Sequence, residues 1–130
     1  ERLATLLRDH LVPPVRLFYS GIRRTTETAA LLAEAFAVEP VELDLIKIAD
    51  DDHPQARGGT SAEIDEVVQT EGETCSTVVL VTHDPVVQAF LNFYLRKHFG
   101  STRTTHPNLW YAEAVVVDGG TGRTSFIRQG

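Results

Sequence analysis

The stretch that decides the fold is Val15-Arg-Leu-Phe-Tyr-Ser20, an apolar strand that runs directly into Gly21-Ile-Arg-Arg-Thr-Thr-Glu-Thr28 and an Ala/Leu-rich helix. A second stretch repeats this pattern, because Val78-Val-Leu-Val-Thr-His83 is followed by Asp84-Pro85 and another apolar helix. Each stretch puts a cationic or ionisable side chain, Arg24 or His83, where a strand ends and a helix begins. The free N–H groups and positive dipole end of a helix N-terminus attract anions. Two such ends side by side predict a phosphate pocket.

The rest of the chain alternates between helical and strand-like hydrophobic patterns. Helices are expected over residues 2–11, 23–37, 61–71 and 84–99, strands over 15–20, 41–46, 77–82, 110–117 and 123–128, and a polar loop over 50–60. This alternation predicts an α/β three-layer sandwich whose mostly parallel central sheet is flanked by helices. In such folds ligands bind beyond the carboxyl ends of the strands, where the strand order reverses. Arg24 and His83 both fall at that rim.

Composition narrows the class of protein. The 130 residues fit a single domain, 1–130, and no apolar run approaches the roughly 20 residues that cross a bilayer, so no membrane partner is expected. The net charge of -6 argues against a nucleic-acid partner, although one local cationic pocket can still bind phosphate. Cys75 is the only cysteine in the sequence, which favours a reducing compartment and a cytoplasmic location.

The two strand-to-helix stretches resemble the motifs of one known family. Ser20-Gly-Ile-Arg-Arg-Thr-Thr-Glu-Thr-Ala29 resembles the Ser-Pro-Leu-x-Arg-Ala-x-Gln-Thr-Ala segment of the histidine phosphatase superfamily, which has the phosphoglycerate-mutase-like fold. Val79-Leu-Val-Thr-His-Asp-Pro-Val-Val87 resembles the second motif of that family, an apolar strand that ends in Ser/Thr-His before a helix. The resemblance implies that Arg24 clamps the phosphate and that His83 donates hydrogen bonds to the transferring group.

The resemblance also implies a proton donor for the leaving group. Asp84 fits by position, because some branches of the family carry an acidic residue directly after the second histidine. Asp is also a favoured N-cap residue, and we give the capping role of Asp84 more weight. Other branches take the donor from the region between the two motifs, where Asp44, Asp50, Asp51 and Asp52 are the candidates.

The family nucleophile lies in an Arg-His-Gly motif, and none of the five histidines in this sequence follows an arginine. In the family that motif ends a central strand that precedes the helix expected at residues 2–11. We therefore expect an N-terminal segment in the natural protein that this sequence lacks. The alternative is a degenerate protein that kept only the phosphate cradle. Two smaller departures are Gly21, where the family usually has Pro, and Glu27, where it usually has Gln.

The expected activity is that of a small phosphatase or phosphomutase of the histidine phosphatase type. It would act on a phosphomonoester or a phosphorylated protein through a phosphohistidine intermediate. The alternative is a catalytically inactive phosphate-binding or protein-interaction module. We expect neither a metal nor another cofactor, because His53 stands in an Asp-rich loop without regular ligand spacing. The His83-Asp84 doublet also occurs in metal-dependent HD phosphohydrolases, but that fold is all-helical and this doublet follows a strand.

Overall fold

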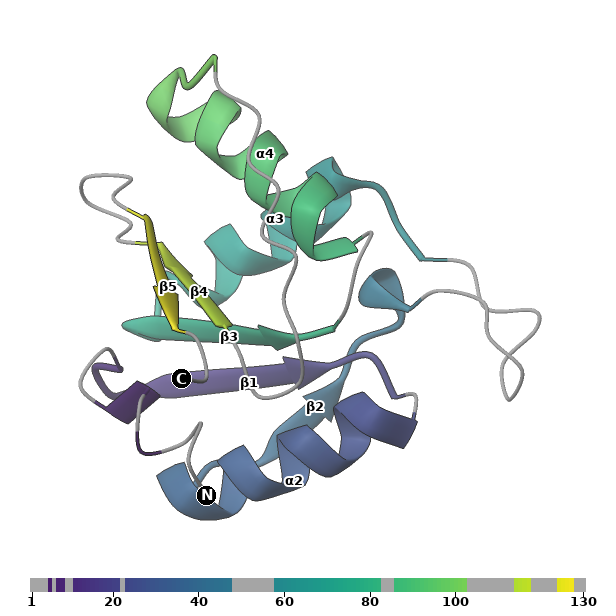
Figure 1. Cartoon of the computed structure of the whole chain (residues 1–130), viewed down its shortest axis with the longest axis vertical. Coiled ribbons are helices and arrows are strands. Elements are labelled where there is room, and N and C mark those ends of the chain that lie inside the picture. Colours follow the sequence, from purple (N-terminus) through teal and green to yellow (C-terminus); the bar gives the residue numbers. More distant parts are fainter. Residues whose placement is uncertain are drawn as a thin grey trace.

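The computed structural model of the chain is described for residues 5, 7, 8, 11–21, 23–47, 58–82, 86–102, 114–117 and 124–127 (Figure 1). Its elements, in chain order, are β1 (Val15–Tyr19), α2 (Arg23–Phe36), β2 (Pro40–Glu42), the short 3-10 helix η2 (Asp44–Ile46), α3 (Ser61–Glu71), β3 (Thr77–Val81), α4 (Val86–Phe99), β4 (Ala114–Val117) and β5 (Thr124–Ile127). For Arg23, β4 and β5 the backbone alone is described.

Three strands form a parallel sheet in the order β2-β1-β3. In the middle strand, Leu17 lies opposite Pro40 on one side and Val79 on the other. The two C-terminal strands, β4 and β5, pair antiparallel with each other and form a separate two-stranded sheet. The α/β class and the parallel sheet are confirmed.

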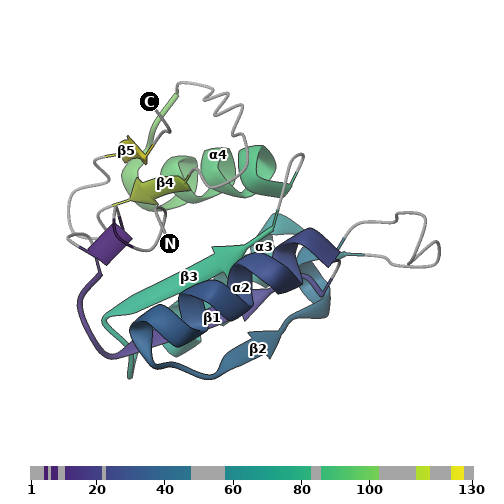
Figure 2. The ribbon, with the colours of Figure 1, turned by 60° about the horizontal axis from the view of Figure 1, so that its bottom comes forward.

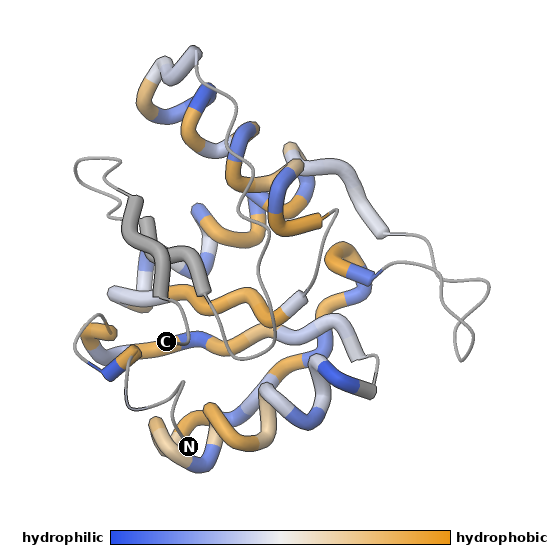
Figure 3. The backbone as a smooth tube through the Cα atoms, in the orientation of Figure 1, coloured by the Kyte–Doolittle hydropathy of each residue, from blue (hydrophilic) through white to orange (hydrophobic). Residues whose placement is uncertain are grey.

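The residues of β1 divide the core between the two faces of the sheet, because successive side chains of a strand point to opposite faces. Leu17 packs with Leu32 and Ala33 of α2, which Figure 2 shows lying along one face. Phe18 packs instead with Ile46 of η2 and Ile64 of α3. Figure 3 shows that β3 is hydrophobic along most of its length, as expected of a strand that packs on both faces.

The start of α3 is set by a capping box, in which a side chain at each end of the first turn satisfies a free backbone N–H. The Thr60 hydroxyl accepts a hydrogen bond from the N–H of Glu63 at 3.2 Å, and the Glu63 carboxylate accepts one from the N–H of Thr60 at 2.8 Å. The helix therefore begins at Ser61, and the prediction of a helix over 61–71 is confirmed.

The predicted strand over 41–46 is wrong in length. The strand β2 ends at Glu42, and the chain then makes the 3-10 helix Asp44–Ile46. Partners far along the chain fix this turn, because the N–H of Gly59 bonds the carbonyl of Leu45 at 2.8 Å. The predicted helix over 2–11 also ends early, since Leu11 lies outside any helix. Most of the predicted loop over 50–60 lies outside the described residues.

The remaining elements agree with the predicted positions. The helix α2 ends at Phe36, one residue before the expected end at 37. The helix α4 and the strands β4 and β5 lie within the predicted ranges 84–99, 110–117 and 123–128, and the remaining residues of those three ranges lie outside the described residues. No helix in the described part of the chain is long and apolar enough to cross a membrane.

The end of α2 contains an alanine in a conformation that suits glycine. Ala37 has a φ of 54°, and the N–H of Val38 bonds the carbonyl of Ala33 at 3.0 Å in a Schellman motif. We expect Ala37→Gly to raise the free energy of unfolding by about 0.5–1 kcal/mol, because the left-handed region costs a residue with a Cβ about 1–2 kcal/mol and glycine loses more chain entropy on folding. Urea unfolding of the two proteins measures the change.

Gly100, at the end of α4, provides the matched control for Ala37. It has a φ of +63°, and a Cβ added there would meet no atom within 4 Å, so any cost is conformational. We expect Gly100→Ala to lower the free energy of unfolding by about 1 kcal/mol. A loss of stability in Ala37→Gly would contradict this account of the helix end.

Candidate functional site

The carboxyl ends of β1 and β3 meet at one edge of the sheet, because the two strands are parallel neighbours. The N–H of Ser20, just beyond β1, bonds the carbonyl of Val81 at the end of β3 at 3.1 Å. The chain places β2 on one side of β1 and β3 on the other, so the strand order reverses between β1 and β3. This is the position at which open α/β sheets bind their ligands.

The turn from β1 into α2 is built on a buried hydroxyl pair. Ser20 and Thr25 are both buried, and their hydroxyl oxygens lie 2.7 Å apart in a hydrogen bond. Between them Gly21 adopts a φ of +84°, a conformation that proline, the usual family residue at this position, cannot take. Arg24 follows in the first turn of α2 and is exposed. The prediction that Arg24 lies at the start of this helix is confirmed.

The second predicted stretch is described only as far as Thr82. The Thr82 hydroxyl donates a hydrogen bond to the carbonyl of Ile46 at 2.9 Å, which ties the end of β3 to η2. His83 and Asp84, the predicted phosphate ligand and proton donor, lie outside the described residues. So do the loop candidates over 50–52 and His53, and the positions of these side chains stay predictions.

Asp44 is the one proton-donor candidate that the structure describes. It begins η2, its side chain is 85% exposed, and its carboxylate pairs with Lys47 at 3.0 Å. The described contacts of Asp44 are those of an exposed ion pair on η2, and its role as a proton donor stays a prediction.

Sequence reasoning missed two residues at this edge, Glu42 and Lys47. Glu42 ends β2 opposite Tyr19 of β1, and its carboxylate accepts a hydrogen bond from the Lys47 ammonium group. The hydrogen bonds with Glu42 and Asp44 raise the pKa of Lys47 and keep it protonated. Glu42 follows an apolar strand as Ser20 does, so its place at a strand end could have been predicted. Because the predicted strand extended to residue 46, Glu42 was instead placed inside it.

Comparisons of the chain with protein-family models, curated proteins and solved structures find no match. Among the described residues, no group of three or more His, Cys, Asp or Glu side chains could hold a metal ion.

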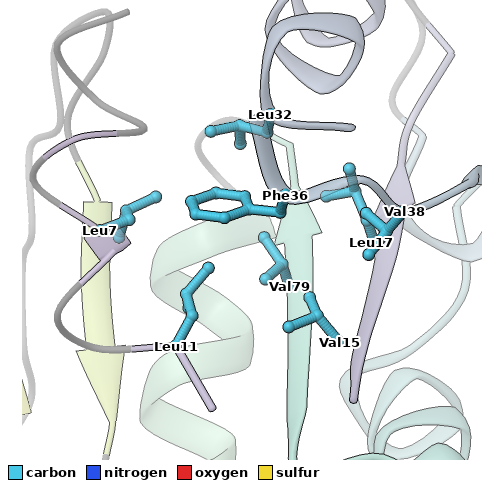
Figure 4. Close-up of a pocket in the computed structure, with 8 residues that line it drawn as sticks. All are labelled: Leu7, Leu11, Val15, Leu17, Leu32, Phe36, Val38 and Val79. Carbon is cyan, nitrogen blue, oxygen red and sulfur yellow. The ribbon is translucent and has the colours of Figure 1, made fainter. Parts of the chain in front are cut away.

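Two further hollows are present in the described part of the chain. The first is lined only by hydrophobic side chains near the amino end of β1, and it is too narrow to hold a water molecule (Figure 4). Its lining residues are Leu7, Leu11, Val15, Leu17, Leu32, Phe36, Val38 and Val79. The second is an open groove over α3, where Glu63, Glu66 and Glu71 would repel a phosphate. Neither hollow competes with the sheet edge as a phosphate site.

A separate charged cluster joins α3 to α4. Asp65 is fully buried, and its carboxylate accepts hydrogen bonds from Lys97 at 2.9 Å, from His98 at 2.9 Å and from Gln69 at 3.2 Å. Burial raises the pKa of Asp65, but the three hydrogen bonds outweigh burial and leave that pKa below its usual value. The His98 ring also contacts the Tyr94 ring, with centroids 4.7 Å apart. Since donors from both helices bond the one Asp65 carboxylate, this cluster joins α3 to α4.

Proposed function

We propose that the chain forms the phosphate-binding part of a phosphatase or phosphomutase of the histidine phosphatase type, with a phosphoglycerate-mutase-like three-layer fold. Its substrate would be a phosphomonoester or a phosphorylated protein, which makes a phosphorylated partner the expected one and a cytoplasmic location suitable. The observation that carries the proposal is the sheet order β2-β1-β3. It brings the ends of β1 and β3, the two strands with the family-like motifs, to one edge where the strand order reverses.

The proposed chemistry needs fixed positive charge around the transferring phosphoryl group. The planar guanidinium of Arg24 is suited to grip two phosphate oxygens at once. His83 would donate a hydrogen bond to a third oxygen. A nucleophilic histidine then forms an N–P bond as the ester P–O bond breaks, and the leaving oxygen takes a proton from Asp84 or another acid. Water next attacks the phosphohistidine and releases inorganic phosphate and the free histidine.

The nucleophile has one favourable place relative to the described sheet, the outer edge of β3. The middle strand β1 is flanked on both sides, and β2 contains Pro40 and the charged Glu42, features that protect an edge. By contrast, β3 is Thr-Val-Val-Leu-Val, with no charge and no proline. Because Thr77 and Val81 bond toward β1, the backbone groups of Val78 and Leu80 face outward. A parallel strand added there would end beside Thr82.

The binding part of the proposal predicts the behaviour of Arg24→Ala. We expect this change to weaken the binding of inorganic phosphate by about 1.5–3 kcal/mol, the range for a hydrogen bond to a charged group. Titration calorimetry of the chain with phosphate at fixed ionic strength measures the difference. Arg16→Gln is the matched control, because Arg16 lies near the start of β1 and pairs with Glu71 at 2.9 Å. Equal phosphate affinity in wild type and Arg24→Ala would refute the binding role.

The catalytic part is tested with the full natural protein and a generic aryl phosphate. Turnover that requires Arg24 and His83, together with an acid-labile phosphohistidine, supports the phosphatase. The absence of an Arg-His-Gly motif from this sequence favours a second candidate, a catalytically inactive phosphate-binding or protein-interaction module. No turnover, combined with phosphate binding that still depends on Arg24, would establish that second function.

A further inference from the structure

The carboxyl group of Glu42 fills the space beside the turn that leads into α2. A Cβ added to Gly21 would lie 2.7 Å from Glu42 Cδ and 2.8 Å from Glu42 Oε2. A side chain at Gly21 would therefore require the Glu42 carboxylate to shift, and the φ of +84° at Gly21 independently disfavours a side chain. The absence of a side chain at Gly21 allows a carboxylate to approach the turn that the proposed phosphate site also uses.

Lys47 holds this carboxylate in place. Its ammonium group bonds Glu42 Oε2 and also pairs with Asp44 Oδ1 at 3.0 Å, and its side chain is 15% exposed. The two carboxylates differ in position. Glu42 is 46% exposed and packs against the turn, whereas Asp44 is 85% exposed and makes no close approach to Gly21. Lys47 can thus release Glu42 and keep Asp44 as a partner.

We propose that Glu42 is a built-in competitor of the phosphate, an autoinhibitory carboxylate that must leave the turn when the phosphate binds, and that Lys47 then becomes a further cation for the bound phosphate. This inference rests on the proposed function, because it assigns regulation to the same site. Two anions cannot share one short turn without repulsion, so phosphate binding displaces the carboxylate from Gly21. Lys47, freed from Glu42 and still paired with Asp44, then has an N–H donor available for the phosphate.

The test compares the affinity of the chain for inorganic phosphate in five proteins, wild type and the variants Arg24→Ala, Glu42→Gln, Lys47→Met and Asp44→Asn, by titration calorimetry at fixed ionic strength. Glu42→Gln keeps the shape of the side chain and removes its charge, and we expect about fivefold tighter binding, the effect of one unit charge roughly 4 Å away in water. Lys47→Met should weaken binding several-fold. Asp44→Asn, which removes the other partner of Lys47, is the matched control and should change the affinity less than twofold.

The outcomes separate this inference from the proposed function. If Arg24→Ala weakens binding but Glu42→Gln leaves the affinity unchanged, or tightens binding no more than Asp44→Asn does, the autoinhibitory role of Glu42 is overturned and the phosphate site stands. If no protein of the set binds phosphate, or if binding does not depend on Arg24, the proposed site itself fails and the role of Glu42 fails with it. Amide spectra of each variant check that the fold is retained.

Discussion

Replacing Ile46 with alanine is expected to lower the free energy of unfolding by about 3–4 kcal/mol, within the range for truncating a buried isoleucine. Ile46 is fully buried and packs with Phe18 and Ile64 between the sheet and α3. The loss combines the transfer free energy of the deleted carbons with the cavity that they leave. Since the carbonyl of Ile46 accepts the Thr82 hydroxyl, loosening this turn also loosens the edge that carries the candidate site.

Urea unfolding of wild type and Ile46→Ala measures this effect. Two control variants distinguish the loss of buried contacts from the mere shortening of an apolar side chain. Ile46→Val removes one methylene and should cost about 0.5–1.5 kcal/mol, while Leu31→Ala removes an apolar side chain that is 46% exposed on α2 and should cost far less. Similar losses for Ile46→Ala and Leu31→Ala would show that η2 is not the core element described here.

The second large effect is expected from Asp65→Asn. This change removes the buried charge that holds Lys97 and His98, and we expect it to lower the free energy of unfolding by about 3 kcal/mol at neutral pH. The value lies at the low end for a broken buried pair, because the Lys97 side chain is 51% exposed and regains water.

The pH dependence of the free energy of unfolding tests whether the charge of Asp65 causes this loss of stability. The pKa of Asp65 is lower in the folded chain than in the unfolded chain, so the stabilisation is complete above about pH 4 and is lost as the pH falls through the lower, folded value. The difference in stability between wild type and Asp65→Asn should therefore shrink on acidification below about pH 4. Asp44→Asn, with its exposed side chain, should follow wild type closely. Parallel curves for wild type and Asp65→Asn at every pH would rule out this role.

Local sequence patterns predicted the elements whose causes are local. The helix Ser61–Glu71 follows from its capping box and from the spacing of Ile64, Val67 and Val68, all of which lie within one short segment. The strands β1 and β3 follow from continuous apolar runs that suit a buried parallel sheet. The strand-to-helix turn at Ser20 could likewise be predicted from the sequence, because Arg24 stands in the first turn of a clearly amphipathic helix.

The predictions failed where distant partners decide the structure. Residues 41–46 alternate apolar and acidic side chains as a strand does, yet Gly59 and Thr82 hold the second half of this segment in a 3-10 turn. The burial of Asp65 cannot be predicted from the pattern of α3 alone, because its partners Lys97 and His98 lie more than thirty residues away. A local hydrophobic pattern carries no information about contacts between such distant residues.

Only part of the candidate site could be predicted from the sequence, because the rest depends on contacts between distant residues. The motifs alone indicate that Arg24 and His83 approach one edge, since both follow strands. They do not reveal that Glu42 packs against Gly21, because this contact depends on the register of β2 beside β1. The carboxylate that packs against Gly21 thus comes from pairing between strands, which single-sequence patterns do not encode.

The most direct test of the central claim is an experimental structure of the chain with inorganic phosphate or vanadate bound. We expect one anion at the carboxyl ends of β1 and β3, contacted by the side chains of both Arg24 and His83, with the Glu42 carboxylate moved away from Gly21. An anion bound elsewhere, or Arg24 and His83 side chains on opposite faces of the sheet, would contradict this claim.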